Sequence, residues 1–549
     1  MEVGIPQGKP KSLWVKENGK SECFNVMLKI EIYISLERGQ TSIWSYVTRE
    51  SEEFLKGGKQ MYESSCASTN RIKRWEDIDF VKAEYEVKKL QMRIVKSVQE
   101  NRYNKAKALQ WTLVHSFYAR AVAVKRVTTN KGKNTPGVDG ICWKSNVEKF
   151  NAIHTLKRRG YQPQPLRRVY IRKKNGKKRP LSIPTMKDRA MQTLYRMALE
   201  PITETVSDRC SMGFRPNRCV QDAIELCFTD LARKSSPEWI LEGDIKGCFD
   251  NINHEWMIQN ICIDTIILKK FLKAGYIESG KWFDTIQGTP QGGAISPTLC
   301  NAVLNGLEPM LKKRFKRYWE KGKFVNPKVN LVRYADDFII TGDSKERLEN
   351  EVLPLVKDFM RKRGLELSEE KTVITNIHDG FDFLGCNIRK YGDKLLTKPS
   401  KDNIKTFLRK CRGTIKASKT AKQVDLINQL NPMIRGWVNF HKHNVSTETF
   451  RYVDYQIMRA LWRWAKRRHK NKNAKWIKDK YFHKIGNRSW CFSEQISEDN
   501  YVKLIYAGDM RITRHTMIRL EANPYDEKWT QYFKDRKRHT QSNFIAIYE

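Results

Sequence analysis

The sequence Leu331-Val332-Arg333-Tyr334-Ala335-Asp336-Asp337-Phe338-Ile339-Ile340 places two adjacent aspartates between apolar runs. Those runs are typical of two short buried strands, so we expect the aspartates at the tip of a hairpin. A second apolar run, Trp239-Ile240-Leu241-Glu242-Gly243-Asp244, also ends in an aspartate. An ordinary acidic turn is the simplest interpretation of an isolated pair. Carboxylates at the ends of two core strands instead indicate a chemical site.

Carboxylates that meet at one sheet edge repel one another and cost stability unless a cation neutralises them. Oxygen ligands of this kind suit Mg²⁺, which keeps part of its water shell when bound. Two such ions about 3.5–4 Å apart can clamp the attacking and the leaving oxygen of an in-line phosphoryl transfer. The sequence therefore supports the hypothesis of a two-metal site built from Asp244, Asp336 and Asp337.

Length and composition restrict the partners of such a site. The chain has 549 residues, enough for about three or four domains. Its formal charge of +42 favours a polyanionic partner such as nucleic acid, and its 40% of apolar residues excludes a disordered polycation. No apolar run is long enough for a transmembrane helix, so we expect no membrane partner. The twelve cysteines form no C-x-x-C pair, which argues against a zinc finger.

The remaining pattern predicts an α+β fold. Arg167–Ile183 has the pattern of a hairpin around the turn Asn175-Gly176, and Met186–Val206 has helical spacing. Strands and helices then alternate to about residue 390. Helical spacing also occurs before the hairpin, from Trp75 to Val127, and again over the basic residues 401–480.

Several short blocks give this pattern a family likeness. Tyr334-Ala335-Asp336-Asp337 resembles the catalytic box of reverse transcriptases, in the form common among group II intron-encoded proteins. The other blocks that resemble this family follow in the family's order: Arg179–Pro184, Gly213–Pro216, Asp244–Asp250, Gly288–Pro297, Phe381–Gly385 and Gly436–His441. The resemblance covers roughly residues 75–535. It implies a right-hand polymerase with fingers, palm and a helical thumb.

The resemblance assigns Asp244, Asp336 and Asp337 as the catalytic residues and metal ligands. Phe249, five residues after Asp244, falls where these polymerases place a steric gate. A flat ring beneath the sugar would clash with a ribose 2′-hydroxyl and so select deoxynucleotides. A core phenylalanine at a strand-to-helix turn is the alternative interpretation.

Three further residues would complete the nucleotide pocket. Gln291 lies in a Pro-Gln-Gly-Gly turn, where glycines let the backbone approach a ligand, and it would contact the sugar of the incoming nucleotide. Lys173 and Arg179 flank the predicted hairpin turn and would hold the triphosphate, Arg179 through its planar guanidinium. Other cations crowd Lys173 in the same turn, a pattern equally typical of a solvated surface.

Residues 397–482 resemble the maturase-specific thumb, or domain X, which grips the template–primer duplex and helps the intron RNA fold for splicing. Basic and aromatic side chains interleave there, which suits an RNA backbone. We expect Trp437, Phe440, Trp462 and Trp464 to pack in the helical core. The residues predicted to contact RNA are the basic ones: Arg158, Arg159, Arg435, Lys442, Arg463, Lys466, Arg467 and Arg468.

The pattern divides the chain into five predicted regions. These are an uncharacterised extension over residues 1–74, the N-terminal extension of the reverse transcriptase over 75–155, fingers and palm over 156–390, the maturase-specific thumb over 391–490, and a basic tail with a remnant DNA-binding region over 491–549. The tail has no paired cysteines or clustered histidines, so we expect no HNH endonuclease domain.

The resemblance implies an RNA-dependent DNA polymerase that is also the splicing maturase of its own group II intron and acts in retrohoming. Its partners would be the intron RNA, an RNA template with a DNA primer, target DNA and dNTPs. Two alternatives stay open: a domesticated reverse transcriptase used in repair or defence, and a splicing maturase without a polymerase role. A homodimer also stays open. The expected compartment is the bacterial cytoplasm, with an organelle as the alternative.

Overall fold

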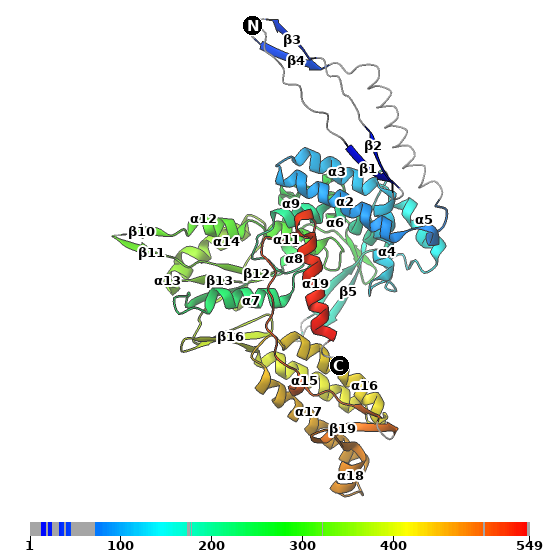
Figure 1. The fold of residues 1–549 in the computed structure, drawn as a ribbon, viewed down its shortest axis with the longest axis vertical. Helices are drawn as coiled ribbons and strands as arrows, with labels where there is room; N and C mark the ends of the chain where they lie inside the picture. Colours follow the sequence, from blue (N-terminus) through cyan, green and yellow to red (C-terminus); the bar gives the residue numbers. More distant parts are fainter. Residues whose placement is uncertain are drawn as a thin grey trace. The chain divides into compact units, whose positions relative to one another are not determined.

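The computed structural model describes residues 72–545, except 173–175, 177, 321, 498 and 499, together with four short strands nearer the N-terminus. The chain divides into two compact units, Met1–Ile78 and Asp79–Glu549. The first unit contains two antiparallel hairpins and a helical turn: β1 (Leu13–Glu17) with β2 (Lys20–Phe24), β3 (Ile32–Glu37) with β4 (Gln40–Ser45), and η2 (Trp75–Asp77). The elements described below belong to the second unit (Figure 1).

Four helices precede the first sheet of this unit: α2 (Phe80–Gln99), α3 (Tyr103–His115), α4 (Phe117–Thr129) and α5 (Asn146–Thr155). The carboxylate of Asp79 caps α2, since it accepts hydrogen bonds from the amides of Val81 and Lys82 at 2.9 and 3.0 Å. α2, α3 and α4 pack around α6 (Met186–Val206), whose residues are almost all buried. The helices predicted before the hairpin are therefore confirmed.

The predicted hairpin forms the fingers sheet. β5 (Leu166–Arg172) pairs antiparallel with β6 (Lys178–Ile183). β5 also pairs in parallel with β8 (Tyr276–Glu278), which turns back as β9 (Lys281–Phe283). Lys173, which falls between β5 and β6 in the sequence, lies outside the described residues.

The palm is a four-stranded antiparallel sheet with the strand order β12-β13-β7-β14. Its strands are β7 (Trp239–Asp244), β12 (Leu331–Tyr334), β13 (Asp337–Gly342) and β14 (Val373–Asn376). Because β7 lies between β13 and β14, the strand that ends at Asp244 runs beside the hairpin that carries the aspartate pair.

Helices and short strands fill the connections between the palm strands, as an α+β fold requires. α7 (Val220–Leu231) precedes β7 and packs against β12. The connecting elements are α8 (Cys248–Asn251), α9 (His254–Asn260), α10 (Thr265–Leu272), α11 (Ser296–Leu304), α12 (Leu307–Arg314), β10 (Tyr318–Glu320), β11 (Lys323–Val325), α13 (Lys345–Arg347), η3 (Leu348–Val352), α14 (Leu353–Arg361) and η4 (Glu369–Lys371).

The thumb is helical, as predicted, and follows a small antiparallel sheet. The strands of this sheet are β15 (Phe381–Phe383), β16 (Cys386–Tyr391) and β17 (Lys394–Pro399). The thumb helices are α15 (Lys401–Ala417), α16 (Gln423–His441), α17 (Thr447–Arg468) and α18 (Ala474–Tyr481). Trp464 belongs to the apolar core of these helices, Trp437 and Trp462 pack against it, and Phe440 is half-buried. These positions agree with the interpretation of the aromatic residues as packing groups.

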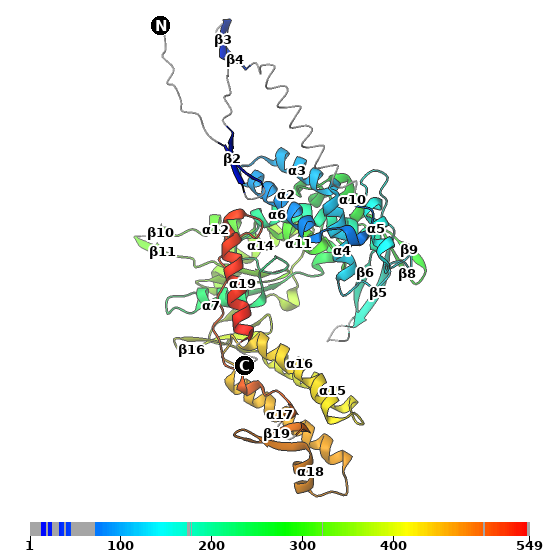
Figure 2. The same cartoon turned by 45° about the vertical axis from the view of Figure 1, so that its right-hand side comes forward.

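The C-terminal region contains structure that the sequence analysis missed. A three-stranded sheet follows the thumb helices and packs on α16: β18 (Phe482–Ile485), β19 (Arg488–Ser497) and β20 (Asn500–Lys503). The predicted boundary at residue 490 falls inside β19, a mostly polar strand that buries only Cys491, Phe492 and Ser493. The last helix is α19 (Thr530–Ile545), which lies beside the palm (Figure 2). Among the described residues, no helix combines the length and apolarity needed to cross a bilayer.

Candidate active site

The palm sheet brings the three aspartates together. In the ladder between β7 and β13, Asp337 lies opposite Asp244, and across the hairpin Asp337 pairs with Tyr334. Tyr334 and Asp337 therefore enclose a two-residue turn formed by Ala335 and Asp336, in which Ala335 has a φ of +60°. One edge of the sheet carries all three carboxylates, which is the juxtaposition that the sequence predicts.

The two adjacent aspartates of the turn have raised pKa values. The pKa of Asp337 rises to about 7, through withdrawal from water and through repulsion from Asp336 and Asp244. Because Asp337 stays exposed at the start of its strand, we attribute most of the rise to repulsion. Burial also raises the pKa of Asp336, against the opposing charges of Arg179 and Lys371. A divalent cation relieves such repulsion and prefers oxygen ligands, so this donor set fits Mg²⁺.

A lysine that the sequence analysis did not single out also reaches the site. Lys371 ends η4, and its Nζ donates to Asp244 Oδ2 at 2.7 Å. This hydrogen bond raises the pKa of Lys371. The lysine side chain is 64% exposed, so the ion pair is well solvated and orients Asp244 more than it stabilises the fold. No local pattern marks Lys371, because its position depends on the pairing of β14 with β7.

The aspartate turn rests on the block Gly213–Pro216. A Cβ on Gly213 would lie 2.3 Å from the backbone nitrogen of Ala335, so no larger residue fits there. Arg215 is buried and forms a two-pronged ion pair with Glu204, with N–O distances of 2.8 and 2.7 Å. Two further hydrogen bonds from Arg215 to backbone carbonyls fix the same loop. The block therefore forms a rigid floor beneath the turn.

A cleft of about 460 Å³ has walls from the fingers and the palm, and its lining includes none of the three aspartates. Phe249 lines the cleft from α8, as does Gln291 from the loop before α11. Phe249 is only 8% exposed, and its ring meets that of Phe214 edge-on at 6.0 Å between centroids. The ring is thus both a core residue and a wall of the cleft, so the two interpretations of Phe249 are compatible.

Hydrogen bonds connect the fingers to the palm through Gln291. Arg179 Nε donates to Gln291 Oε1 at 2.8 Å, and Gln291 Nε2 donates to Asp250 Oδ2 at 2.9 Å. The carbonyl of Gln291 also accepts a hydrogen bond from the amide of Ser182 at 2.7 Å. The structure therefore brings together Arg179, Gln291 and Phe249, which the sequence assigned to one pocket.

The predicted RNA-contacting residues differ in their surroundings. Arg158 forms an ion pair with Asp264, which neutralises its charge, and Lys442 is only 6% exposed. Arg435 and Lys442 line a groove of about 1040 Å³ between α16 and the β18–β20 sheet. The remaining cations of the set are exposed: Arg159, Arg463, Lys466, Arg467 and Arg468.

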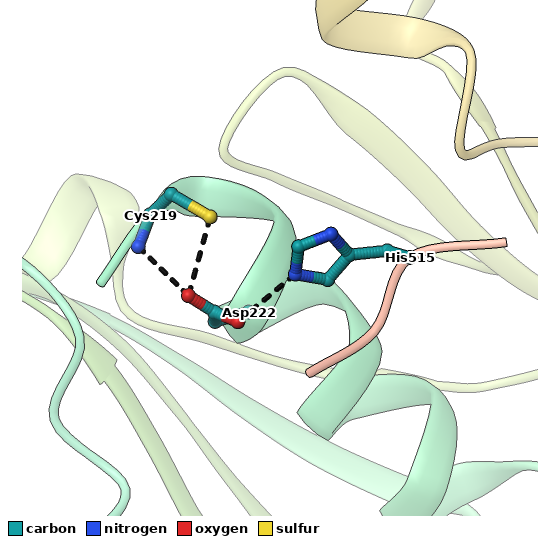
Figure 3. Close-up of side chains that lie close together, drawn as sticks. All are labelled: Cys219, Asp222 and His515. Atoms are coloured by element: carbon teal, nitrogen blue, oxygen red, sulfur yellow. Dashed lines mark hydrogen bonds and ion pairs between the residues drawn. The ribbon is translucent and has the colours of Figure 1, made fainter. Parts of the chain in front are cut away.

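A cluster outside the cleft joins α7 to the C-terminal segment (Figure 3). Asp222 is fully buried, with Cys219 Sγ at 3.2 Å and His515 Nε2 at 2.9 Å from its carboxylate oxygens. These three side chains place possible metal ligands within 4.8 Å of one another. Arg536 of α19 and the amide of Ile518 donate to the same carboxylate, each at 2.8 Å. Since a guanidinium already neutralises Asp222, we interpret the cluster as an anchor and name these five residues the Asp222 clasp.

The segment that the clasp anchors also contacts the thumb. The ring of His443, two residues after α16 ends, hydrogen-bonds through Nδ1 to the carbonyl of Thr513 at 2.7 Å. Farther along, Tyr525 donates to Glu200 of α6 at 2.8 Å. Residues 513–536 therefore connect the thumb to the palm, a role that the sequence analysis did not foresee.

Three family models match separate parts of the chain. The model described as reverse transcriptase (RNA-dependent DNA polymerase) matches residues 171–388. The N-terminal domain of reverse transcriptase matches residues 75–156, and the group II intron maturase-specific domain matches residues 404–482.

Individual proteins are also similar to the chain. It is 35% identical over 316 residues to protein YkfC of Escherichia coli, covering 50% of this chain and 82% of that protein. A telomerase structure from Candida tropicalis matches with a TM-score of 0.36 and 16% identity, over 57% of this chain and 58% of that one. The chain is 31% identical over 466 residues to the group II intron-encoded protein LtrA of Lactococcus lactis, covering 69% of this chain and 77% of LtrA. With its reverse transcriptase and maturase-specific domains, the chain belongs to the group II intron-encoded proteins and is an RNA-directed DNA polymerase.

Proposed function

We propose that the chain extends a DNA primer on an RNA template by two-metal nucleotidyl transfer at the palm edge, and that it acts in the splicing and retrohoming of a group II intron. The observation that carries this proposal is the register of the palm sheet, in which Asp337 lies opposite Asp244 with Asp336 in the adjoining turn. Such a convergence of acids is costly unless a cation compensates it.

The catalytic acids would be Asp244, Asp336 and Asp337, which would hold two Mg²⁺ ions. When bound, the ions supply Lewis-acid stabilisation of the charge on the attacking and leaving oxygens. The protein's own part is to keep these carboxylates ionised and correctly oriented. Lys371 supports that task from one side, because its Nζ donates to Asp244 Oδ2 at 2.7 Å and helps to orient this carboxylate.

The incoming dNTP would bind in the cleft between the fingers and the palm. Arg179 is exposed on β6, and its guanidinium can exchange Gln291 for phosphate oxygens. Lys173, which precedes β6 in the sequence, would add a second cation to the triphosphate site. The ring of Phe249 would occupy the space of a ribose 2′-hydroxyl, while Gln291 would contact the sugar.

The RNA partners would bind through dispersed basic residues. Arg159 in the fingers and Arg463, Lys466 and Arg467 on α17 are exposed, and the chain carries a formal charge of +42. Contacts of this kind position a phosphate backbone and make affinity fall steeply with salt. We propose the intron RNA, the template–primer duplex and the target DNA as the ligands. The bacterial origin of LtrA and YkfC favours the bacterial cytoplasm as the compartment.

Primer extension on an RNA template, run beside a splicing assay with the parent intron, tests the proposal. We expect the same preparation to incorporate dNTPs and to accelerate splicing. Incorporation without splicing would indicate a domesticated reverse transcriptase. Splicing without incorporation would indicate a maturase that has no polymerase role.

A further inference from the structure

Arg333 is a buried cation behind the aspartate turn, and the proposed chemistry does not use it. Its side chain is 0% exposed. Nη1 donates to Asn301 Oδ1 at 3.3 Å and Nη2 donates to Asn305 Oδ1 at 3.2 Å, so these two partners are neutral. The buried carboxylate of Asp208 favours the charge on Arg333, while burial opposes it and lowers the pKa of the guanidinium. The hydrogen bonds of the guanidinium nevertheless go to neutral acceptors beside the aspartate turn, so Arg333 is placed to hold these groups in position.

The same guanidinium reaches the turn itself. Nη1 also donates to the carbonyl oxygen of Ala335 at 3.3 Å. Ala335 has a φ of +60°, in the left-handed region that residues other than glycine seldom adopt. Its carbonyl belongs to the peptide unit that leads into Asp336. The orientation of this peptide therefore determines where the Asp336 carboxylate points.

The partners of Arg333 connect the turn to two other parts of the palm. Asn301 belongs to α11 and Asn305 follows it, and α11 begins directly after the loop that contains Gln291. Asn301 Nδ2 also donates to the carbonyl of Gly213, at 2.9 Å, in the floor beneath the turn. One side chain thus links the helix behind the nucleotide cleft, the floor and the turn.

We propose that Arg333 is a positioning residue, which holds the Ala335 peptide in its left-handed conformation and thereby directs the Asp336 carboxylate towards Asp244 and Asp337. Arg333 does not contact the proposed substrate, and it acts through Ala335. The inference rests on the proposed function in one respect, since it takes Asp336 as a metal ligand.

The test compares Arg333→Met and Arg333→Lys with Arg363→Met. Arg363 is a matched control, because this half-buried palm arginine also donates to neutral groups, the carbonyls of Val303 and Phe359 at 2.7 and 2.9 Å. Two readouts do not depend on catalysis: amide hydrogen exchange of residues 334–337 in the metal-free protein, and the affinity for Mn²⁺ by electron paramagnetic resonance. The kcat and KM for dNTP are measured at several Mg²⁺ concentrations.

We expect Arg333→Met to speed exchange in the turn and to weaken Mn²⁺ binding, each by about tenfold, as loss of support for a strained backbone conformation implies. The KM for dNTP should stay the same, and added Mg²⁺ should restore part of kcat. Arg333→Lys keeps the charge but loses the planar fork, so it should fall between Arg333→Met and wild type. Arg363→Met should change neither readout.

Arg333→Met that matches wild type in both hydrogen exchange of the turn and Mn²⁺ affinity would overturn the inference. The inference would also fail if Arg363→Met changed both readouts as much as Arg333→Met does. If Arg333→Met does not fold, Asn305→Ala removes one acceptor and should shift both readouts in the same direction, and no shift there would overturn it. A wild-type protein that binds no Mn²⁺ would refute the proposed function instead. The exchange comparison would still test the role of Arg333 in that case.

Discussion

Replacing Asp222 by alanine removes the acceptor of five hydrogen bonds at once. Two of them come from the amide and thiol of Cys219, at 3.0 and 3.2 Å. The other three come from the C-terminal segment: His515 Nε2 at 2.9 Å, and the amide of Ile518 and the guanidinium of Arg536 at 2.8 Å each. The carboxylate is fully buried, so water cannot replace these partners without opening the clasp.

The size of the effect follows from the charge on the carboxylate. Hydrogen bonds to charged groups contribute about 1.5–3 kcal/mol each, but bonds to one shared acceptor do not add. Removal of one partner of a buried ion pair typically costs about 3–5 kcal/mol, and Arg536 is the partner left behind. We expect Asp222→Ala to cost about that amount. The loss should fall on residues 513–536, because three of the five donors belong to that segment.

Hydrogen exchange of residues 513–536, together with limited proteolysis, measures this loss directly. Asp222→Ala should expose the segment while the protection of β7 and β13 in the palm changes little. Asp509→Ala is the control, since Asp509 forms an exposed ion pair with Arg488 and its removal should cost about 1 kcal/mol or less. Primer extension should yield shorter products with Asp222→Ala, because the thumb loses its connection to the palm.

The pH dependence of the clasp has a definite sign. Burial opposes ionisation of Asp222, but the donors from His515 and Arg536 prevail and hold its pKa well below the ordinary value. A carboxyl group whose pKa is lowered by folding stabilises the folded state at pH values above its unfolded-state pKa. This stabilisation is lost as the pH falls through the pKa of the folded state. The clasp should therefore hold at neutral pH and open only in acid. If Asp222→Ala protects residues 513–536 as well as wild type does, the clasp does not anchor them.

Three further predictions address the cleft, the metal edge and the thumb. Phe249→Ala should admit ribonucleotides, because it removes the ring from the space of the 2′-hydroxyl, and unchanged discrimination in single-nucleotide incorporation would place the gate elsewhere. The pKa of Asp337 near 7 exceeds its unfolded value, so its contribution to stability in the metal-free protein should disappear as the pH rises through about 7. Mn²⁺ binding requires the ionised carboxylate and should tighten over the same range, and affinity that is independent of pH in a titration would contradict this assignment. Trp437→Ala should lower the free energy of unfolding by about 3–5 kcal/mol with little change in RNA affinity, because the indole stacks on Phe407 at 4.6 Å and donates to Asn403 at 2.7 Å. A large loss of RNA affinity in a stably folded Trp437→Ala variant would make the indole a base-stacking platform.

The features that the sequence predicted correctly are local or strongly patterned. The β12–β13 hairpin follows from apolar runs on either side of Asp336 and Asp337, and α6 begins at Met186, the predicted position. The meeting of Asp244 with Asp337 could be expected because acidic residues at two core strand ends have few other uses. The proposed division of the chain into five regions, and the role of Lys173, remain predictions.

The features that the sequence did not reveal depend on contacts between distant segments. Lys371 reaches Asp244 only because β14 pairs with β7, and nothing near Lys371 in the sequence signals that pairing. The Asp222 clasp joins α7 to residues nearly three hundred positions later, as the hydrogen bond to His515 shows. β19 was missed because most of its side chains are polar and exposed, so the alternation typical of a half-buried strand is weak.

Single-nucleotide incorporation on an RNA template with a DNA primer, by wild type and by Asp336→Ala, shows whether the palm edge is the catalytic centre. Asp379→Ala serves as the control, because Asp379 is an exposed aspartate in the turn after β14, away from the carboxylate edge. We expect Asp336→Ala to abolish dNTP incorporation, since the metal site loses a ligand, while RNA affinity stays near wild type because many separate cations provide it. Incorporation by Asp336→Ala within about tenfold of wild type would contradict the assignment of the palm edge as the catalytic centre.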